Sequence, residues 1–175
     1  HQNPQYCFAV EPDIVLNSKW RQNFALLQNY DWCFELQVFA SQMRNAAKLA
    51  AEFREIPMIL QHCGMPEDNS TLGMAFWLEE MKFLADQPNV YCKFSGLGTF
   101  LRQNSPDFIS EVTGYCLELF GADRCLYGSN FPIEKIWTSY SNLINSYFQS
   151  LLGLSWPEQK RIFYSNAKEV YKINT

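Results

Sequence analysis

The sequence has few basic residues, and they are scattered. Its 175 residues include 14 lysines and arginines against 18 aspartates and glutamates, which gives a formal net charge of -4. Nucleic acids and anionic membranes attract clustered lysine and arginine, so we expect neither as a partner. With only eight glycines and eight prolines, the chain also lacks the composition of collagen-like and low-complexity proteins.

Long apolar runs and targeting segments are also missing. No apolar stretch approaches the roughly 18 to 20 residues that a transmembrane helix needs. Residues 1–4 have neither the basic nor the apolar region of a signal peptide, and the first residue is His1 instead of Met. We therefore expect a cytoplasmic protein whose first residue here is an internal cut in a longer chain.

Six cysteines are present, but no two of them form a C-x-x-C pair. They are Cys7, Cys33, Cys63, Cys92, Cys116 and Cys125. Cysteines paired at short spacing are the usual sign of a metal or redox motif, and that sign is absent. The prediction is buried free thiols in a reducing compartment, with disulfides or a metal cluster as the alternatives.

Apolar residues make up 47% of the chain and aromatic residues 16%, which is enough for one folded core. Segments with helical periodicity alternate with apolar segments of strand type. Ser18 and Ser41 are expected to cap the first two helices. The later helices are expected at Thr71–Ala85, at Asp107–Phe120 and in two segments after Pro132, the last opened by a capping box of Ser155 and Glu158.

Single helices separate the expected strands, which are Trp32–Phe39, a segment starting at Pro57, Asn89–Ser95 and Arg124–Ser129. Such βαβ units form parallel sheets with right-handed crossovers, so we predict the α/β class. No linker, repeat or change of composition divides the chain, so residues 1–175 are expected to form one domain. Polar or glycine-rich residues close each strand, where α/β folds bind their ligands.

Two residues at strand ends are the first candidates for chemistry. His62 lies where a strand meets its loop, a position from which an imidazole can polarise a carbonyl or exchange a proton. A hydrogen-bonded structural histidine is the alternative. Asn130 lies in a GSNFP segment at the mouth of the last strand, where ordinary turn chemistry also accounts for it.

Three more polar residues lie in or beside the expected strands. Lys93 is inside an apolar strand, so its ammonium group must reach water, a carboxylate or a ligand. Ser95 shares the strand face of Lys93, and Gln37 shares a face with Glu35, because strand side chains alternate. A lysine that extends to solvent from an edge strand is the alternative. Lipase, P-loop, dinucleotide-binding and zincin motifs are absent.

Three segments together resemble the amidohydrolase-related family, whose members include lactonases and decarboxylase-like metal-dependent hydrolases. They are QHCGMP, PNVYCKFSGLG and FGADRCLYGSNFP, and Ser165-Asn166-Ala167 followed by Tyr171 is similar to the family's usual end. The resemblance covers the chain from about Pro4 onward. Family members are (β/α)8 barrels of the TIM type, of about 250 residues. The resemblance therefore implies that the four strands are strands five to eight, the carboxyl-terminal half of a barrel.

The resemblance also implies roles for individual residues. His62 matches the family's sixth-strand histidine and would polarise the carbonyl, while Asn130 stands where the family usually has a catalytic aspartate. Gln37 falls near a metal-ligating histidine of metal-dependent relatives, and glutamine is a poor zinc ligand. We therefore expect no metal in this chain, and a divalent ion such as zinc in complete relatives. Gln37, Lys93 and Ser95 are the expected substrate-binding residues, with Lys93 holding a substrate carboxylate.

Three functional interpretations follow. The first is a family member with hydrolase ancestry that acts on a lactone or a similar small cyclic ester, with reduced or metal-free activity. The second is a non-catalytic scaffold or interaction protein that forms a homo-oligomer to cover the open edges of its half-barrel. The third is one fragment of a longer hydrolase whose missing amino-terminal half carries the remaining strands.

Overall fold

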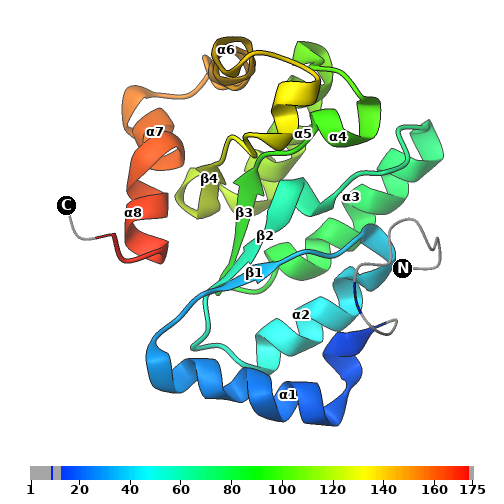
Figure 1. The fold of residues 1–175 in the computed structure, drawn as a ribbon, viewed down its shortest axis with the longest axis vertical. Coiled ribbons are helices and arrows are strands. Elements are labelled where there is room, and N and C mark those ends of the chain that lie inside the picture. Colours follow the sequence, from blue (N-terminus) through cyan, green and yellow to red (C-terminus); the bar gives the residue numbers. More distant parts are fainter. Residues whose placement is uncertain (1–8, 10–12, 174–175) are drawn as a thin grey trace.

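A four-stranded parallel sheet forms the centre of the computed structural model, which describes Ala9 and residues 13–173 (Figure 1). The strands lie side by side in the order in which they occur along the chain. They are β1 (Phe34–Leu36), β2 (Met58–Leu60), β3 (Val90–Phe94) and β4 (Cys125–Tyr127). Each neighbouring pair is parallel, with Glu35 opposite Ile59 and Ile59 opposite Tyr91. The predicted α/β class and parallel sheet are confirmed.

Helices connect the strands and continue beyond the last one. They are α1 (Ser18–Phe24), α2 (Met43–Glu52), α3 (Thr71–Ala85), α4 (Gly98–Leu101), α5 (Pro106–Phe120), α6 (Tyr140–Ser150), α7 (Trp156–Lys160) and α8 (Asn166–Val170). A π-helical turn over Arg161–Ser165 joins α7 to α8. Within the described part of the chain, every helix is too short or too polar to cross a membrane.

The structure corrects some of the expected boundaries. Asn17, and not Ser18, caps α1, because its side-chain oxygen accepts a hydrogen bond from the Trp20 backbone amide at 3.0 Å. The capping role predicted for Ser41 is also wrong, since α2 begins only at Met43, after a 3-10 turn that contains Ser41. The helix expected at Thr71–Ala85 and the capping box at the start of α7 are confirmed. All four strands are shorter than expected, because fewer residues pair than the apolar segments contain.

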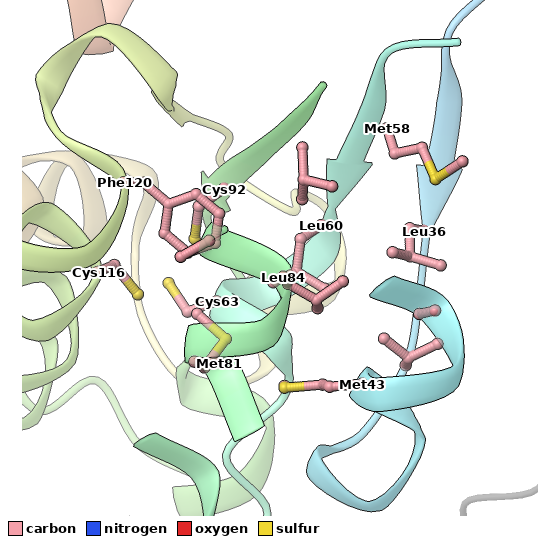
Figure 2. Packing of buried hydrophobic residues seen from close by; sticks show 14 of the residues in the cluster. Leu36, Met43, Met58, Leu60, Cys63, Met81, Leu84, Cys92, Cys116 and Phe120 are labelled. Atoms are coloured by element: carbon pink, nitrogen blue, oxygen red, sulfur yellow. The ribbon is translucent and has the colours of Figure 1, made fainter. Parts of the chain in front are cut away.

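Helices α2, α3 and α5 cover one face of the sheet, and α6 continues this layer beside α5 (Figure 1). Alternate strand residues point into the interface between this layer and the sheet. Figure 2 shows Met58 and Leu60 of β2 and Cys92 of β3 packed among Met81, Leu84 and Phe120 of the helices. These six side chains are buried, so this interface is the main hydrophobic core.

The opposite face of the sheet has a smaller apolar cluster. Ile59 of β2 and Leu126 of β4 are fully buried there against Val170 of α8, with Tyr91 and Tyr171 packed beside them. The chain from α7 to α8 lies along β4 (Figure 1). The carboxyl-terminal helix therefore covers part of the face that does not contact α2, α3 and α5.

A buried amide ties this helix to the sheet. The Asn166 side chain donates hydrogen bonds of 2.7 Å to the backbone carbonyls of Ala122 and Cys125 and is 1% exposed. These carbonyls lie before and at the start of β4, so one side chain satisfies two buried acceptors and fixes α8 against the strand. A buried acceptor without a partner is costly, which makes this contact important for stability.

Replacing Asn166 with Ala should destabilise the fold. Asn166→Ala leaves two carbonyls without their donor, and we expect a loss of about 1–3 kcal/mol in the free energy of unfolding. Urea denaturation measures the loss. The control is Asn145→Ala, the same change at an exposed position of α6. Equal stability of the two variants would show that the Asn166 contacts contribute nothing.

Candidate functional site

His62 follows β2 directly, in a tight turn at the carboxyl end of the strand. Its backbone has a positive φ of 55°, and that of Cys63 has a φ of 52°. Non-glycine residues rarely adopt this conformation, so surrounding contacts must hold it. Two such contacts are present, from the Met65 amide to the His62 carbonyl and from the Trp77 indole to the Cys63 carbonyl, both at 2.9 Å.

Ser95 orients the His62 imidazole. Its hydroxyl lies 2.9 Å from His62 Nδ1, and the Ser95 side chain is buried directly after the end of β3. Gly96 allows this close approach, because a Cβ atom added there would lie 2.4 Å from Nδ1. Gly96 also has a positive φ of 64°. The structure thus brings together two of the predicted site residues, His62 and Ser95.

The environment keeps the His62 imidazole neutral. Burial, together with the positive charge of Lys93, lowers the pKa of His62 from its usual 6.5 to about 4. The negative charge of Glu35 acts in the opposite direction but is the weaker influence. At neutral pH the ring therefore has one nitrogen that carries a proton and one that accepts a hydrogen bond.

Lys93 is held in a polar network on the face of the sheet that does not contact α2, α3 and α5. Its ammonium group lies 2.8 Å from the Glu35 carboxylate and 3.3 Å from the Tyr171 hydroxyl. The Tyr171 hydroxyl also donates a hydrogen bond to Glu35. Burial and the neighbouring Glu35 carboxylate raise the pKa of Tyr171. Of the water, carboxylate or ligand that the Lys93 ammonium was expected to reach, the structure supplies a carboxylate, that of Glu35 in β1.

Asn130 lies just beyond β4, also with a positive φ, of 51°. Its side-chain amide donates a long hydrogen bond, 3.5 Å, to the carboxylate of Glu134, which is fully buried. The Thr99 hydroxyl donates to the same oxygen at 3.2 Å. Burial raises the pKa of Glu134, and the hydrogen bonds from Asn130 and Thr99 offset part of this rise. Glu134 therefore links α4, which follows β3, to the loop after β4.

Gln37 lies apart from these contacts. It follows the end of β1 and is exposed. Among the described residues, its side chain takes no part in the hydrogen bonds of His62 with Ser95 or of Asn130 with Glu134. Tyr171, in the network around Lys93, and Glu134, beside Asn130, were not among the site residues expected from the sequence. Tyr171 lies 136 residues from Glu35, so spacing along the chain gives no sign of their contact.

Comparison with known proteins defines the family. The family model described as Amidohydrolase matches residues 6–173, nearly the whole chain. The chain belongs to this family. It is 32% identical over 173 residues to the uncharacterized protein y4mH of Sinorhizobium fredii and 25% identical over 173 residues to an L-fucono-1,5-lactonase of Burkholderia multivorans. These matches cover 99% and 91% of this chain, but only 58% of each relative's length.

Solved structures of amidohydrolases have the same fold. A crystal structure of an amidohydrolase from Burkholderia multivorans with bound zinc superposes with a TM-score of 0.87 at 24% identity. The match covers 94% of this chain and 62% of that one. The four parallel strands therefore correspond to part of an amidohydrolase barrel of the TIM type, as the resemblance of the three segments implied.

The strand-end residues of this amidohydrolase chain do not by themselves form a zinc site. Catalytic zinc usually has three protein ligands drawn from histidine, carboxylate and thiolate groups. Of the site residues expected from the sequence at these strand ends, His62 is the one suitable donor, since Asn130 and Gln37 carry neutral amides. The Glu134 carboxylate accepts the hydrogen bonds of Asn130 and Thr99 through one oxygen, and among the described residues it belongs to no group of three metal-ligating side chains. We therefore derive no catalytic step through a metal.

The pKa of His62 should depend on Lys93. Lys93→Met removes a positive charge that disfavours the imidazolium, so we expect the pKa to rise from about 4 part of the way toward 6.5. An NMR pH titration of the ring protons measures it, with His1 the only other histidine. In the control Lys48→Met, at an exposed position of α2, the pKa of His62 should stay unchanged. An unchanged value in Lys93→Met would contradict the electrostatic influence of Lys93.

A methyl group at Gly96 should disturb this site. Gly96→Ala places a carbon 2.4 Å from His62 Nδ1 and forces alanine into a positive φ, so we expect a loss of about 1–3 kcal/mol in stability. The matched control is Gly114→Ala in α5, where an added Cβ meets open space. That change should gain about 0.5–1 kcal/mol. Thermal and urea unfolding compare the two variants, and a stable Gly96→Ala protein would argue against the close contact.

Proposed function

We propose that this chain is part of a hydrolase that opens a lactone or a similar small cyclic ester. The single observation that carries the proposal is the neutral His62 imidazole, held by Ser95 at the carboxyl end of β2. Membership of the amidohydrolase family supports it, and so does the similarity to an L-fucono-1,5-lactonase. The substrate is a small molecule in this proposal.

In the proposed reaction His62 acts as a hydrogen-bond donor. His62 Nδ1 lies 2.9 Å from the Ser95 hydroxyl, and in this proposal the hydroxyl donates to Nδ1 so that the ring proton is on Nε2. Nε2 then donates to the carbonyl oxygen of the ester and stabilises the negative charge that develops there when water attacks. Water adds to the carbonyl carbon and loses a proton to solvent. The ring C–O bond then breaks, the leaving oxygen takes up a proton from solvent, and the product is a hydroxy acid. A neutral imidazole suits this role because it keeps its proton across the physiological pH range.

Asn130 positions the attacking water in this proposal. An amide has no usable basicity, so Asn130 can only orient the water by hydrogen bonds. Loss of a general base typically lowers the rate by about 10²–10⁴-fold. The proposed activity of this chain's site is therefore weaker than that of a relative with aspartate at the same place.

Lys93 and Gln37 have supporting roles in the proposal. The ammonium of Lys93 is engaged by Glu35 and Tyr171, so we propose that it acts on His62 through its charge. Direct binding of a substrate carboxylate, expected from the sequence, would require Lys93 to leave this ion pair. Gln37 is exposed beyond the end of β1, where it can contact a substrate at the carboxyl ends of the strands.

The proposed active protein has more strands than these four. Among the described residues, β1 and β4 each pair on one side only, and relatives are longer than this chain. We propose that an amino-terminal segment of a longer protein pairs with these edges, with residues 1–175 as the carboxyl-terminal half of a single barrel domain. A homo-oligomer is the alternative partner. The coding sequence upstream of His1 tests the first arrangement, and a His-x-His strand there would support it.

Restoring a carboxylate should raise activity. In the complete protein, Asn130→Asp supplies a proton acceptor beside the proposed water, and we expect the hydrolysis rate to rise by about 10²-fold or more. A panel of sugar lactones and other cyclic esters, followed by acid release, provides the assay. Asn145→Asp, an exposed change of the same kind in α6, is the control and should leave the rate unchanged.

A second variant separates the catalytic proposal from the scaffold interpretation. His62→Ala removes the proposed donor, and we expect at least a 10²-fold loss in kcat/KM with retained secondary structure. Hydrolysis that survives this change would overturn the role of His62. If neither the parent nor Asn130→Asp hydrolyses any member of the panel, the catalytic proposal fails and a non-catalytic scaffold is favoured.

A further inference from the structure

Three cysteines from separate elements meet in the core. Cys63 follows His62 after β2, Cys92 lies in β3, and Cys116 lies in α5. Their three sulfur atoms all lie within 4.8 Å of one another, and none of the three residues is exposed (Figure 2). The fold therefore gathers three sulfur donors without any paired cysteine motif in the sequence.

The surroundings of this three-cysteine cluster are apolar and rich in sulfur. Figure 2 shows Met81 and Phe120 beside the cysteines. Cys125 is also buried, and its thiol points to the Cys116 carbonyl at 3.8 Å. No histidine or carboxylate of the described residues belongs to the cluster. The side-chain donors at the cluster are thus sulfur groups, which favour a soft metal ion over a hard one.

We propose that Cys63, Cys92 and Cys116 bind one Cu(I) ion with three sulfur ligands. Metal–thiolate bonds of about 2.3 Å in a trigonal arrangement place the sulfur atoms about 4 Å apart, so the cluster needs to contract only slightly. Structural zinc sites are almost always tetrahedral with four ligands. The cluster has three members, which suits a trigonal Cu(I) site better than zinc. This proposal is independent of the proposed hydrolase activity.

Binding exchanges protons for the metal ion. Each cysteine that coordinates as a thiolate releases one proton, so two thiolates and one neutral thiol around Cu(I) leave a net charge of -1. Loss of the third proton makes it -2, which an apolar core resists.

The proposed ion would join three elements of the fold. Cys63 belongs to the turn that also carries His62, whereas Cys92 and Cys116 belong to the sheet and to the helix layer that covers it. Coordination would cross-link β3, α5 and this turn from inside the core. A ligand that binds only the folded state raises the unfolding temperature, so stability reports occupancy without any substrate.

The test measures how much Cu(I) the reduced protein retains in the absence of oxygen. Because the cluster is buried, the protein is refolded with and without Cu(I), and loosely bound copper is then removed with the chelator bicinchoninate. We expect one equivalent of retained Cu(I), an ultraviolet thiolate-to-copper absorption band, and a rise in Tm of about 5–10 °C at saturation. X-ray absorption should give three sulfur neighbours. No retained copper, or retained zinc in preference to copper, would overturn the proposal.

Matched alanine variants locate the site. Cys63→Ala, Cys92→Ala and Cys116→Ala should each weaken Cu(I) retention at least 10-fold, while Cys33→Ala, outside the cluster, should retain it fully. Equal loss in Cys33→Ala would overturn the assignment, and loss in Cys125→Ala would overturn the three-ligand geometry. Circular dichroism confirms folding of each variant. If an alanine variant does not fold, the sulfur count from X-ray absorption of the parent decides the question.

Discussion

The turn after β2 is the constraint on which both the His62 site and the three-cysteine cluster depend. His62 and Cys63 have consecutive positive φ values, so the chain reverses sharply at the end of the strand. The first side chain faces Ser95, and the second enters the core beside Cys92. The backbone strain of such residues is tolerated where neighbouring contacts fix them, as the Trp77 indole does for the Cys63 carbonyl. One turn therefore sets the positions of the His62 imidazole and of a buried thiol together.

Burial and a nearby positive charge together keep the His62 imidazole neutral. Lys93 lies on the face of the sheet opposite α2, α3 and α5. Its ammonium group is paired with the Glu35 carboxylate, which partly neutralises its charge. Burial is the larger cause of the low pKa of His62, and Lys93 adds to it. Tyr171 joins the same pair from the end of the chain, which connects the carboxyl-terminal helix to the charge balance of the site. The packing of α8 and the chemistry of His62 are thus coupled through one ion pair.

Most of the fold could be predicted from the sequence, because it depends on local periodicity. The four apolar segments and the helix at Thr71–Ala85 follow directly from the residue pattern. His62 could be found because a polar residue after an apolar strand is visible in the sequence. The cysteine cluster and the network around Lys93 could not, since each joins residues from separate elements. Such contacts depend on the order of the strands and on the layer of helices, which spacing along the chain does not encode.

Asn130 shows why a single departure from a family pattern does not dismantle the site around it. The loop after β4 is held by Glu134, whose buried carboxylate also accepts a hydrogen bond from Thr99 of α4, directly after the loop that follows β3. The two loops are therefore tied by protein groups that remain when the residue at 130 is an amide. Because a buried carboxylate is costly unless hydrogen-bonded, these contacts favour one arrangement of the loops. If position 130 acts on water as proposed, its residue can thus be changed while the Glu134–Thr99 contact near the strand ends is kept.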